Sequence, residues 1–382
     1  MSAEKALPPL LTQYLRLPPE VSLSLVTSVL GASANWVLER YLIAALAGPS
    51  RHGEETEAGA GEDTRVVLVS WMSNWDSWRT EIRRTSGLDI AKLAQQHRFA
   101  FVDGLTGLLD SSNHRVPTKE EYSSGEIPIK QSPQSIRSPG TTPTVLNMSP
   151  IDPAPRKQGN LSPGPPELKQ DSRSASIRRP VKLPAENGRY VLSSDSLISL
   201  ENTTLRAKEF VTATQASSED SKEPRVLLIL DQPDLLLSTT QDPSKCFPAL
   251  LSTITALSQL QYVQATVVGV GADPHLTAAA TAELDREEAA IRAFSPLESH
   301  HSAFLMSLAH RARVVFQLRR LESGWASDVS GVLRVSPGGA WDSGDEEVAS
   351  NEGVEGQEKE MLYCVKADGS VKVFERGAGG VG

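Results

Sequence analysis

The sequence predicts an α/β fold in which helices flank a mostly parallel, twisted β-sheet. Three observations support this class. Several short apolar runs are continuous rather than alternating, which is typical of strands buried on both faces. Most of these runs are followed by a segment with helical spacing of apolar residues, which favours parallel βα units. Near the end of the chain, two alternating runs flank a turn, which predicts antiparallel strands there.

Residues 1–20 are predicted to form an N-terminal arm. The pairs Pro8-Pro9 and Pro18-Pro19 flank a few apolar side chains, which favours an extended segment that packs on the domain. The first strand is expected within 21–30, because this apolar run has β character. A helix is expected over 35–46, where apolar residues return near one helical face.

The first part of the core, residues 21–109, contains two further strands. They are predicted at 65–71 and 99–104, again from continuous apolar character. Helices are expected between them, at 74–84 and 87–97.

Residues 110–189 have the composition of a disordered insertion. They are rich in Pro and Ser, poor in aromatic residues, and carry more Lys and Arg than Asp and Glu. Such a segment cannot bury enough apolar surface to offset its chain entropy. Its Ser-Pro and Thr-Pro dipeptides fit proline-directed phosphorylation, and a neutral linker explains them equally.

The second part of the core, residues 190–341, resumes the alternation. The run at 225–231 is the best candidate for a central strand, and it ends at Asp231. The other elements expected here are helices at 195–211, 247–261, 276–294 and 299–311 and strands at 262–270, 313–321 and 330–335.

The chain ends with an acidic segment and a hairpin. Residues 342–360 are rich in acids, Gly and Ser, and are predicted to be a second disordered loop. Residues 361–376 carry two alternating runs around Asp368-Gly369, a strong hairpin signal. A parallel βα core that ends in antiparallel strands is the RecA-type arrangement.

The loop after the first strand lies where many α/β proteins bind a phosphate. A working phosphate loop needs several glycines, a Lys for the phosphates and a Ser or Thr for the metal. Residues 21–46 hold one glycine, Gly31, and no Lys. Gly31 and Ser33 are therefore interpreted as positions of a degenerate nucleotide site. A plain strand, turn and helix of a buried sheet accounts for the same pattern.

Asp231 ends the central strand, where an acid would order metal-bound water in a nucleotide-hydrolysing enzyme of this type. Without the Lys of the first loop, that role is hard to sustain. We expect Asp231 to accept hydrogen bonds from loop amides at the carboxyl edge of the sheet.

Composition excludes several classes of function. The formal net charge of −9 argues against a nucleic-acid-binding field over the whole molecule. Cys246 and Cys364 lack the spacing of a metal or disulfide framework. His300, His301 and His310 have no second ligand cluster, so no metal is expected. No apolar run is long enough for a membrane span, and no secretory signal is evident.

Several ordered segments together resemble the sixth subunit of the Elongator complex in its fungal form. They are residues 17–36 (LPPEVSLSLVTSVLGASANW), 69–78 (VSWMSNWDSW), 87–89 (GLD), 99–105 (FAFVDGL) and 227–234 (LLILDQPD). The resemblance covers roughly 20–109 and 190–335, and it depends on the order of the segments rather than on any one motif.

The resemblance implies a RecA-like fold without intact nucleotide motifs, no cofactor and no catalytic residues. It further implies a heterohexameric ring with Elongator subunits four and five, attached to the catalytic subcomplex. That ring binds tRNA and supports modification of wobble uridines. We expect an intracellular protein, cytoplasmic and nuclear. The alternatives are an unrelated RecA-like scaffold or adaptor, and an ATPase with an aberrant phosphate loop.

Three cationic residues are candidates for contacts with partners. Arg319 and Arg320 end an apolar strand and are candidate contacts to a neighbouring subunit, because ring ATPases donate an arginine in trans. Ordinary surface arginines would give the same pattern. Lys245 is the only Lys or Arg in the loops expected at the carboxyl edge of the sheet, so it is the candidate tRNA contact.

Overall fold

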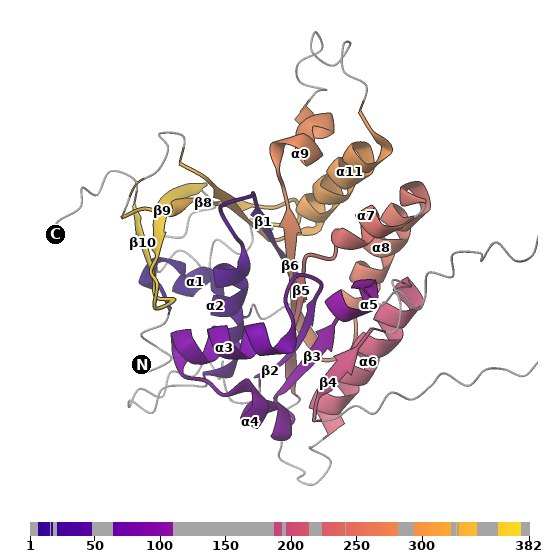
Figure 1. The fold of residues 1–382 in the computed structure, drawn as a ribbon, viewed down its shortest axis with the longest axis vertical. Helices are drawn as coiled ribbons and strands as arrows, with labels where there is room; N and C mark the ends of the chain where they lie inside the picture. Colours follow the sequence, from indigo (N-terminus) through magenta and orange to yellow (C-terminus); the bar gives the residue numbers. More distant parts are fainter. Residues whose placement is uncertain are drawn as a thin grey trace, which may run out of the picture. The chain divides into compact units, whose positions relative to one another are not determined.

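A computed structural model of the chain is shown in Figure 1. It describes residues 7–15, 17, 21–47, 64–109, 187–192, 196–213, 224–240, 242–281, 294–321, 326, 328–341 and 358–375. The expectations for 110–186 and 342–357 lie outside these residues. So do those for the Ser-Pro dipeptides and for most of 282–294.

The described residues form a ten-stranded sheet with the order β10-β9-β8-β7-β1-β6-β5-β2-β3-β4. The strands from β7 to β4 in this order are parallel, and β7 to β10 are antiparallel. The strands are β1 (Ser22–Ser28), β2 (Thr64–Ser70), β3 (Phe99–Asp103), β4 (Arg189–Val191), β5 (Arg225–Asp231), β6 (Val263–Gly271), β7 (Val314–Arg319), β8 (Gly331–Pro337), β9 (Lys359–Val365) and β10 (Val371–Glu375).

This topology confirms the predicted RecA-like class. The chain passes from β1 to β2 and leaves room for two strands, β5 and β6, that enter later. The order reverses at β1, since β7 returns on the opposite side of it. Such a switch point places the working loops of an α/β sheet at its carboxyl edge.

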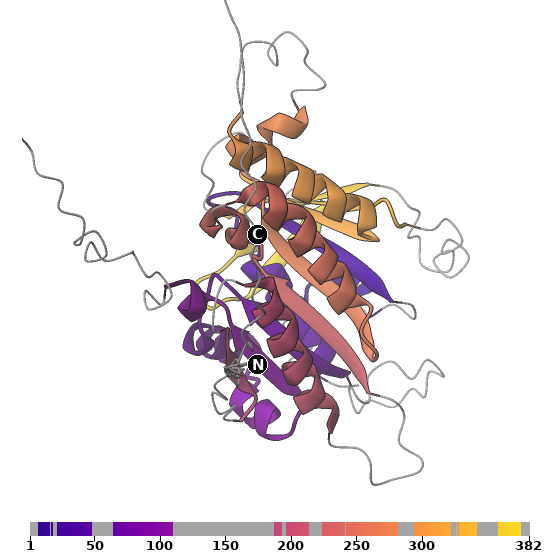
Figure 2. The ribbon, with the colours of Figure 1, turned by 90° about the vertical axis from the view of Figure 1, so that its right-hand side faces the viewer.

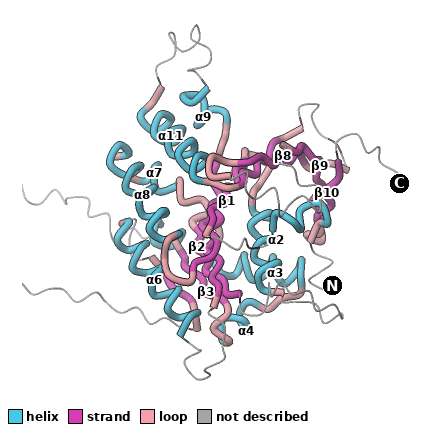
Figure 3. The backbone as a smooth tube through the Cα atoms, turned by 180° about the vertical axis from the view of Figure 1, so that it is seen from behind, coloured by secondary structure: helices cyan, strands magenta, loops and turns pink. Residues whose placement is uncertain are grey.

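Helices cover both faces of the parallel sheet, as Figures 1 and 3 show. One face carries α1 (Thr12–Leu15), α2 (Asn35–Leu46), α3 (Trp75–Ser86) and α4 (Ile90–Gln95). The other carries α6 (Leu197–Thr212), α7 (Leu235–Thr239), α8 (Pro243–Ser258) and α11 (Pro296–Arg311), with α9 (Pro274–Thr281) against α11. In Figure 2, α6, α8 and α11 lie side by side over this face. The short α5 (Leu105–Leu109) follows β3.

The two helical layers explain why the strands are continuous apolar runs. In β5, Leu227 and Ile229 belong to the core under α2 and α3, while Val226, Leu228 and Leu230 belong to the core under α6 and α8. Alternate side chains of one strand point to opposite faces, so a sheet covered on both sides needs apolar residues at every position.

Some boundaries and conformations differ from the sequence expectations. The arm is helical rather than extended over Pro9–Leu15, because Pro9 has the fixed φ that suits the first position of a helical turn. The helix expected from residue 247 begins at Pro243, for the same reason. Lys359 and Glu360, placed in the acidic loop, belong to β9. The three-residue edge strand β4 was too short to be predicted.

The substitution Ile229→Ala should destabilise the protein by about 2–5 kcal/mol, because it leaves a cavity in the middle of the central strand, where Ile229 is fully buried. Ile198→Ala is the matched control. Ile198 is 71% exposed on α6, so its loss should change the free energy of unfolding by no more than about 0.5 kcal/mol. Urea unfolding of both variants measures the difference, and equal effects would contradict the buried position of β5.

Candidate functional site

Five parallel strands end together at the carboxyl edge of the sheet. Their registers align the ends of β1 and β6, of β5 and β2, and of β2 and β3. The residues in question are Ser28, Gly271, Asp231, Ser70 and Asp103. A nucleotide-binding protein of this fold would hold its ligand at this edge.

The loop after β1 is a tight turn rather than an open phosphate cradle. The N–H of Ala32 donates to the carbonyl of Val29 at 2.8 Å, and the two residues form an antiparallel bridge. Gly31 has a φ of 87°, the left-handed value that the third residue of a type II turn needs. We call residues 29–32 the Gly31 turn. Only two residues separate its ends, which leaves no concave backbone around a phosphate.

The amides that a phosphate would require are bonded within the chain. The N–H of Leu30 donates to Asp273 Oδ1 at 2.8 Å, and the N–H of Asn35 donates to Ser33 Oγ at 3.2 Å. The N–H of Val37 donates to the carbonyl of Ala34 at 2.9 Å. Phosphate loops bind anions because several of these groups point at the ligand. Ser33 therefore acts at the start of α2, and the Gly31 turn offers few free donors.

Asp231 forms a buried pair with Ser70 of β2. The Ser70 hydroxyl donates to Asp231 Oδ2 at 2.6 Å, and the Ser70 oxygen accepts from the amide of Ser73 at 3.0 Å. Asp231 was expected to accept from loop amides directly, but its carboxylate reaches them through Ser70. Burial raises the pKa of Asp231 to about 6, with the Ser70 bond lowering it and Asp234 raising it. In the sheet order, β6 lies between the strand that ends at Asp231 and the strand that leads into the Gly31 turn.

Asp234 and His301 make a second buried polar pair beside it. His301 Nε2 lies 3.2 Å from Asp234 Oδ2, which also accepts from the amide of Gly271 at 3.2 Å. These bonds tie α11 and the loop after β5 to the end of β6. Among the described residues, no group of three or more His, Cys, Asp or Glu side chains is arranged to hold a metal ion.

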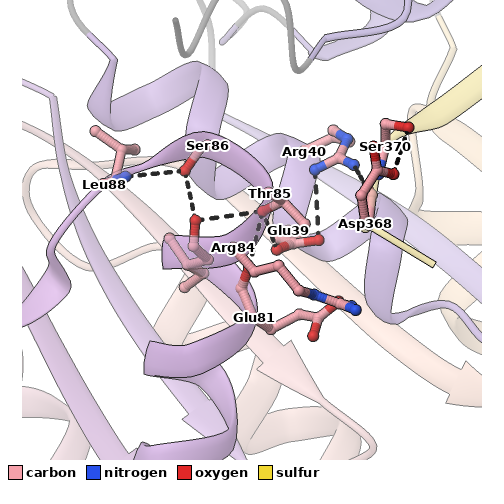
Figure 4. Close-up of polar contacts among 11 residues, drawn as sticks. Glu39, Arg40, Glu81, Arg84, Thr85, Ser86, Leu88, Asp368 and Ser370 are labelled. Atoms are coloured by element: carbon pink, nitrogen blue, oxygen red, sulfur yellow. Dashed lines mark hydrogen bonds and ion pairs between the residues drawn. The ribbon is translucent and has the colours of Figure 1, made fainter. Parts of the chain in front are cut away.

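A third polar cluster links α2 to α3 and to the C-terminal hairpin (Figure 4). Glu39 and Arg40 lie in the middle of the otherwise apolar α2 and are 2% and 0% exposed. Thr85 Oγ1 donates to Glu39 Oε1 at 2.6 Å. Arg40 Nη2 donates to the carbonyl of Gly369 at 2.7 Å, and Arg40 Nη1 lies 3.4 Å from Glu39 Oε2. Burial raises the pKa of Glu39 to about 7, although Thr85 and Arg40 lower it.

A cavity of about 390 Å³ lies between this cluster and the Gly31 turn. We call it the acidic aromatic cavity. Its walls include Trp36 and Glu39 of α2, Trp78 and Glu81 of α3, and Tyr363 of β9. Gly31 and Ser33 also line it, whereas Asp231 does not. Two of the three positions interpreted as a degenerate nucleotide site therefore share one cavity, and the third stands apart.

The structure also places the cationic candidates. Arg320 lies over the Gly31 turn, and its Cδ is 3.4 Å from where a Cβ on Gly31 would lie. Arg319 pairs with Glu360 of β9 at 2.6 Å. Lys245 is in the first turn of α8, 3.0 Å from Asp242, with its side chain 87% exposed. None of the three lines the acidic aromatic cavity, and their roles toward partners stay predictions.

Sequence reasoning missed Glu39, Glu81 and Tyr363 because each belongs to a segment assigned only to secondary structure. One signal was present. Glu39-Arg40 interrupts an apolar helix, and two adjacent charges cannot both avoid the core when nearly the whole helix is buried. The partners of that pair come from segments far away in the sequence, so no local pattern could name them.

Comparisons with known proteins concern the fold. No family model and no curated protein matches the chain. An uncharacterised protein of Pyrococcus horikoshii, solved with an unknown peptide, is similar in structure at 12% identity and a TM-score of 0.49, over 99% of this chain and 100% of that one. A KaiC-like protein of the same archaeon gives 11%, 0.42, 97% and 97%. The ATPase domain of a third protein gives 8%, 0.38, 92% and 84%. No described helix is long and apolar enough to cross a membrane.

The stability of the protein should depend on pH through Glu39. Its pKa is about 7 in the folded chain and 4.5 as a free side chain, so the folded state binds more protons between these values. The contribution of Glu39 to stability is therefore complete below pH 4.5 and is lost as the pH rises to about 7, by roughly 3 kcal/mol. Over this range, wild type should lose stability relative to Glu39→Gln, which stays neutral.

Urea unfolding of wild type and Glu39→Gln at several pH values measures this difference. Glu358→Gln serves as the control, because Glu358 is half exposed and its loss should give a difference that hardly changes with pH. A constant difference between wild type and Glu39→Gln would show that Glu39 is ionised in the folded protein.

Proposed function

We propose that this chain is a non-catalytic RecA-like subunit of a hetero-oligomeric ring, the sixth subunit of the Elongator complex. In this role it supports the modification of tRNA wobble uridines by completing the ring and its tRNA-binding surface. The observation that carries the non-catalytic part is the Gly31 turn, whose ends are bridged and whose neighbouring amides are bonded within the chain.

The surroundings of the turn support the same interpretation. The acidic aromatic cavity beside it presents Glu39 and Glu81 where a nucleotide would bring negative charge. Carboxylates and phosphates repel one another, and among the described residues no Lys or Arg lines this cavity to offset them. Asp231 remains at the position of a hydrolytic acid, but its Oδ2 is bonded to Ser70 and it does not reach the cavity.

The family assignment depends on the resembling segments, and the fold brings several of them together. Residues 17–36 supply β1, the Gly31 turn and the start of α2, while residues 69–78 supply the end of β2 and the start of α3. Both line the acidic aromatic cavity. Their clustering supports a shared structural role at one edge of the sheet, as expected where a RecA-like subunit meets a neighbour.

The test of this function is copurification. The tagged full-length chain should bring down two other RecA-like chains in equal amounts, the fourth and fifth Elongator subunits, together with the catalytic subcomplex. Partners of another kind, with no RecA-like chain among them, would favour the unrelated scaffold and overturn the assignment.

The isolated chain should neither bind nor hydrolyse ATP. A ligand at one hundred times its dissociation constant stabilises a protein by about 2.7 kcal/mol, so binding would raise the unfolding midpoint clearly. We expect no change with Mg-ATP. ATP turnover that Asp231→Ala abolishes would instead identify an ATPase with an aberrant loop.

The isolated chain should bind tRNA weakly and with strong salt sensitivity, because its net charge is −9 and phosphate neutralisation dominates such affinity. The assembled ring should bind more tightly. Lys245→Glu should weaken binding by the ring and lower its salt slope by about 1 or more, since the charge is reversed. A salt series of tRNA binding measures both species.

Lys372→Glu is the matched control, an exposed lysine of β10 in the antiparallel part of the sheet. It should leave the ring's tRNA affinity and salt slope unchanged. Equal losses for Lys245→Glu and Lys372→Glu would mean that only total charge matters and that Lys245 makes no specific contact. Tight, salt-resistant binding by the lone chain would show a complete RNA site within it.

A further inference from the structure

The acidic aromatic cavity presents negative charge to its interior. Glu39 lies at its buried end and Glu81, with a side chain 43% exposed, at its open side. The two nearby arginines face elsewhere. Arg40 donates to the carbonyl of Gly369, and Arg84 donates to the carbonyl of Ala367 at 2.6 Å while also contacting Glu81. Figure 4 shows these side chains between α2, α3 and the hairpin turn.

Aromatic rings form the rest of the walls. Trp36 and Tyr363 stack at a tilt of 38° with their ring centroids 5.1 Å apart. Trp78 is 3% exposed, and its indole N–H has no acceptor among the described residues. A buried donor without a partner costs about 1–3 kcal/mol, so a ligand that supplies an acceptor gains by satisfying it.

These features together define a ligand. The carboxylates call for a cation, the flat rings favour one with a planar face, and the indole N–H calls for a carbonyl oxygen. A guanidinium group is planar, always charged, stacks on aromatic rings and binds carboxylates through two parallel hydrogen bonds. An ammonium group would meet the charge but not the stacking. The carbonyl oxygen follows if the guanidinium group arrives on a peptide.

We propose that the acidic aromatic cavity receives an arginine side chain of the neighbouring subunit, with a backbone carbonyl of the same segment accepting from Trp78. The proposal rests on the proposed ring. RecA-like rings donate an arginine in trans to the nucleotide of the next protomer. Here the carboxylates of Glu39 and Glu81 replace the phosphates as its partner, so this interface closes without nucleotide.

Direct binding by the isolated full-length chain is the first test. The probe is Nα-acetyl-arginine amide, titrated at pH 8 so that Glu39 is ionised, with ¹⁵N-labelled indole signals as the readout. We expect saturable binding that moves the Trp78 indole signal. Nα-acetyl-citrulline amide, which has the same shape without the charge, should not bind. No binding of the arginine probe, or equal binding of the citrulline probe, would overturn the proposal.

Variants locate the site. Glu39→Gln and Glu81→Gln should each weaken binding of the arginine probe by about tenfold, the loss of one charge-assisted hydrogen bond. Glu358→Gln removes a half-exposed carboxylate just before β9 and should leave the affinity unchanged. If the two cavity variants bind the probe as wild type does, the cation lies elsewhere and the proposal is wrong.

The second test uses the assembled ring. With the ring partners present, the double variant Glu39→Gln/Glu81→Gln should raise the concentration at which the ring dissociates by about tenfold or more, and Glu358→Gln should not. A ring that forms and resists dilution equally well in the double variant overturns this inference and leaves the proposed function standing. Failure of the wild-type chain to enter any ring overturns the proposed function, and the neighbour as source of the arginine falls with it.

Discussion

The guanidinium group of Arg40 is fully buried and joins parts of the fold that are far apart in the sequence. It donates to the turn between β9 and β10, more than three hundred residues later, and it lies beside Glu39, which is bonded to Thr85 of α3. The antiparallel hairpin is thereby held against the same helix that starts at the Gly31 turn. Arg84 adds a second bond from α3 to that hairpin. The geometry of the carboxyl edge on this side depends on these bonds.

The burial of this pair has an electrostatic cost that shapes the whole cavity. Charged groups lose several kcal/mol of solvation in a protein interior, and attraction between partners recovers it only with good geometry. Arg40 Nη1 and Glu39 Oε2 are 3.4 Å apart, longer than the roughly 2.7–2.9 Å typical of a charge-assisted hydrogen bond. Glu39 is therefore incompletely compensated, which agrees with its raised pKa of about 7. A buried carboxylate in this condition gains from any further donor.

Sequence patterns were sufficient for most of the fold and for little of the site. The β1 run, α2 and the β5 run were predicted to within a few residues, because a sheet covered on both faces imposes continuous apolar strands and amphipathic or apolar helices. The absence of a Lys near Gly31 was also visible, since a missing residue type is a local fact. By contrast, the partnership of Ser70 with Asp231 depends on the register of β2 against β5, which are far apart in the chain. The pairing of Arg40 with Gly369 is longer in range still. Helical conformation in the N-terminal arm was missed because a proline fits both an extended segment and the first turn of a helix.

The Gly31 turn also bears on how this surface would change under mutation. In a phosphate loop, a lost lysine is a single substitution away from return. Here the backbone itself is a short turn bridged between Val29 and Ala32, and the N–H of Leu30 is bonded to Asp273. A lysine introduced near Ser33 would meet no concave loop, and Glu39 would be its nearest buried charge. Recovery of nucleotide binding would require inserted residues as well as substitutions. The absence of this chemistry is therefore hard to reverse, and selection on this edge of the sheet can act only through what it contacts.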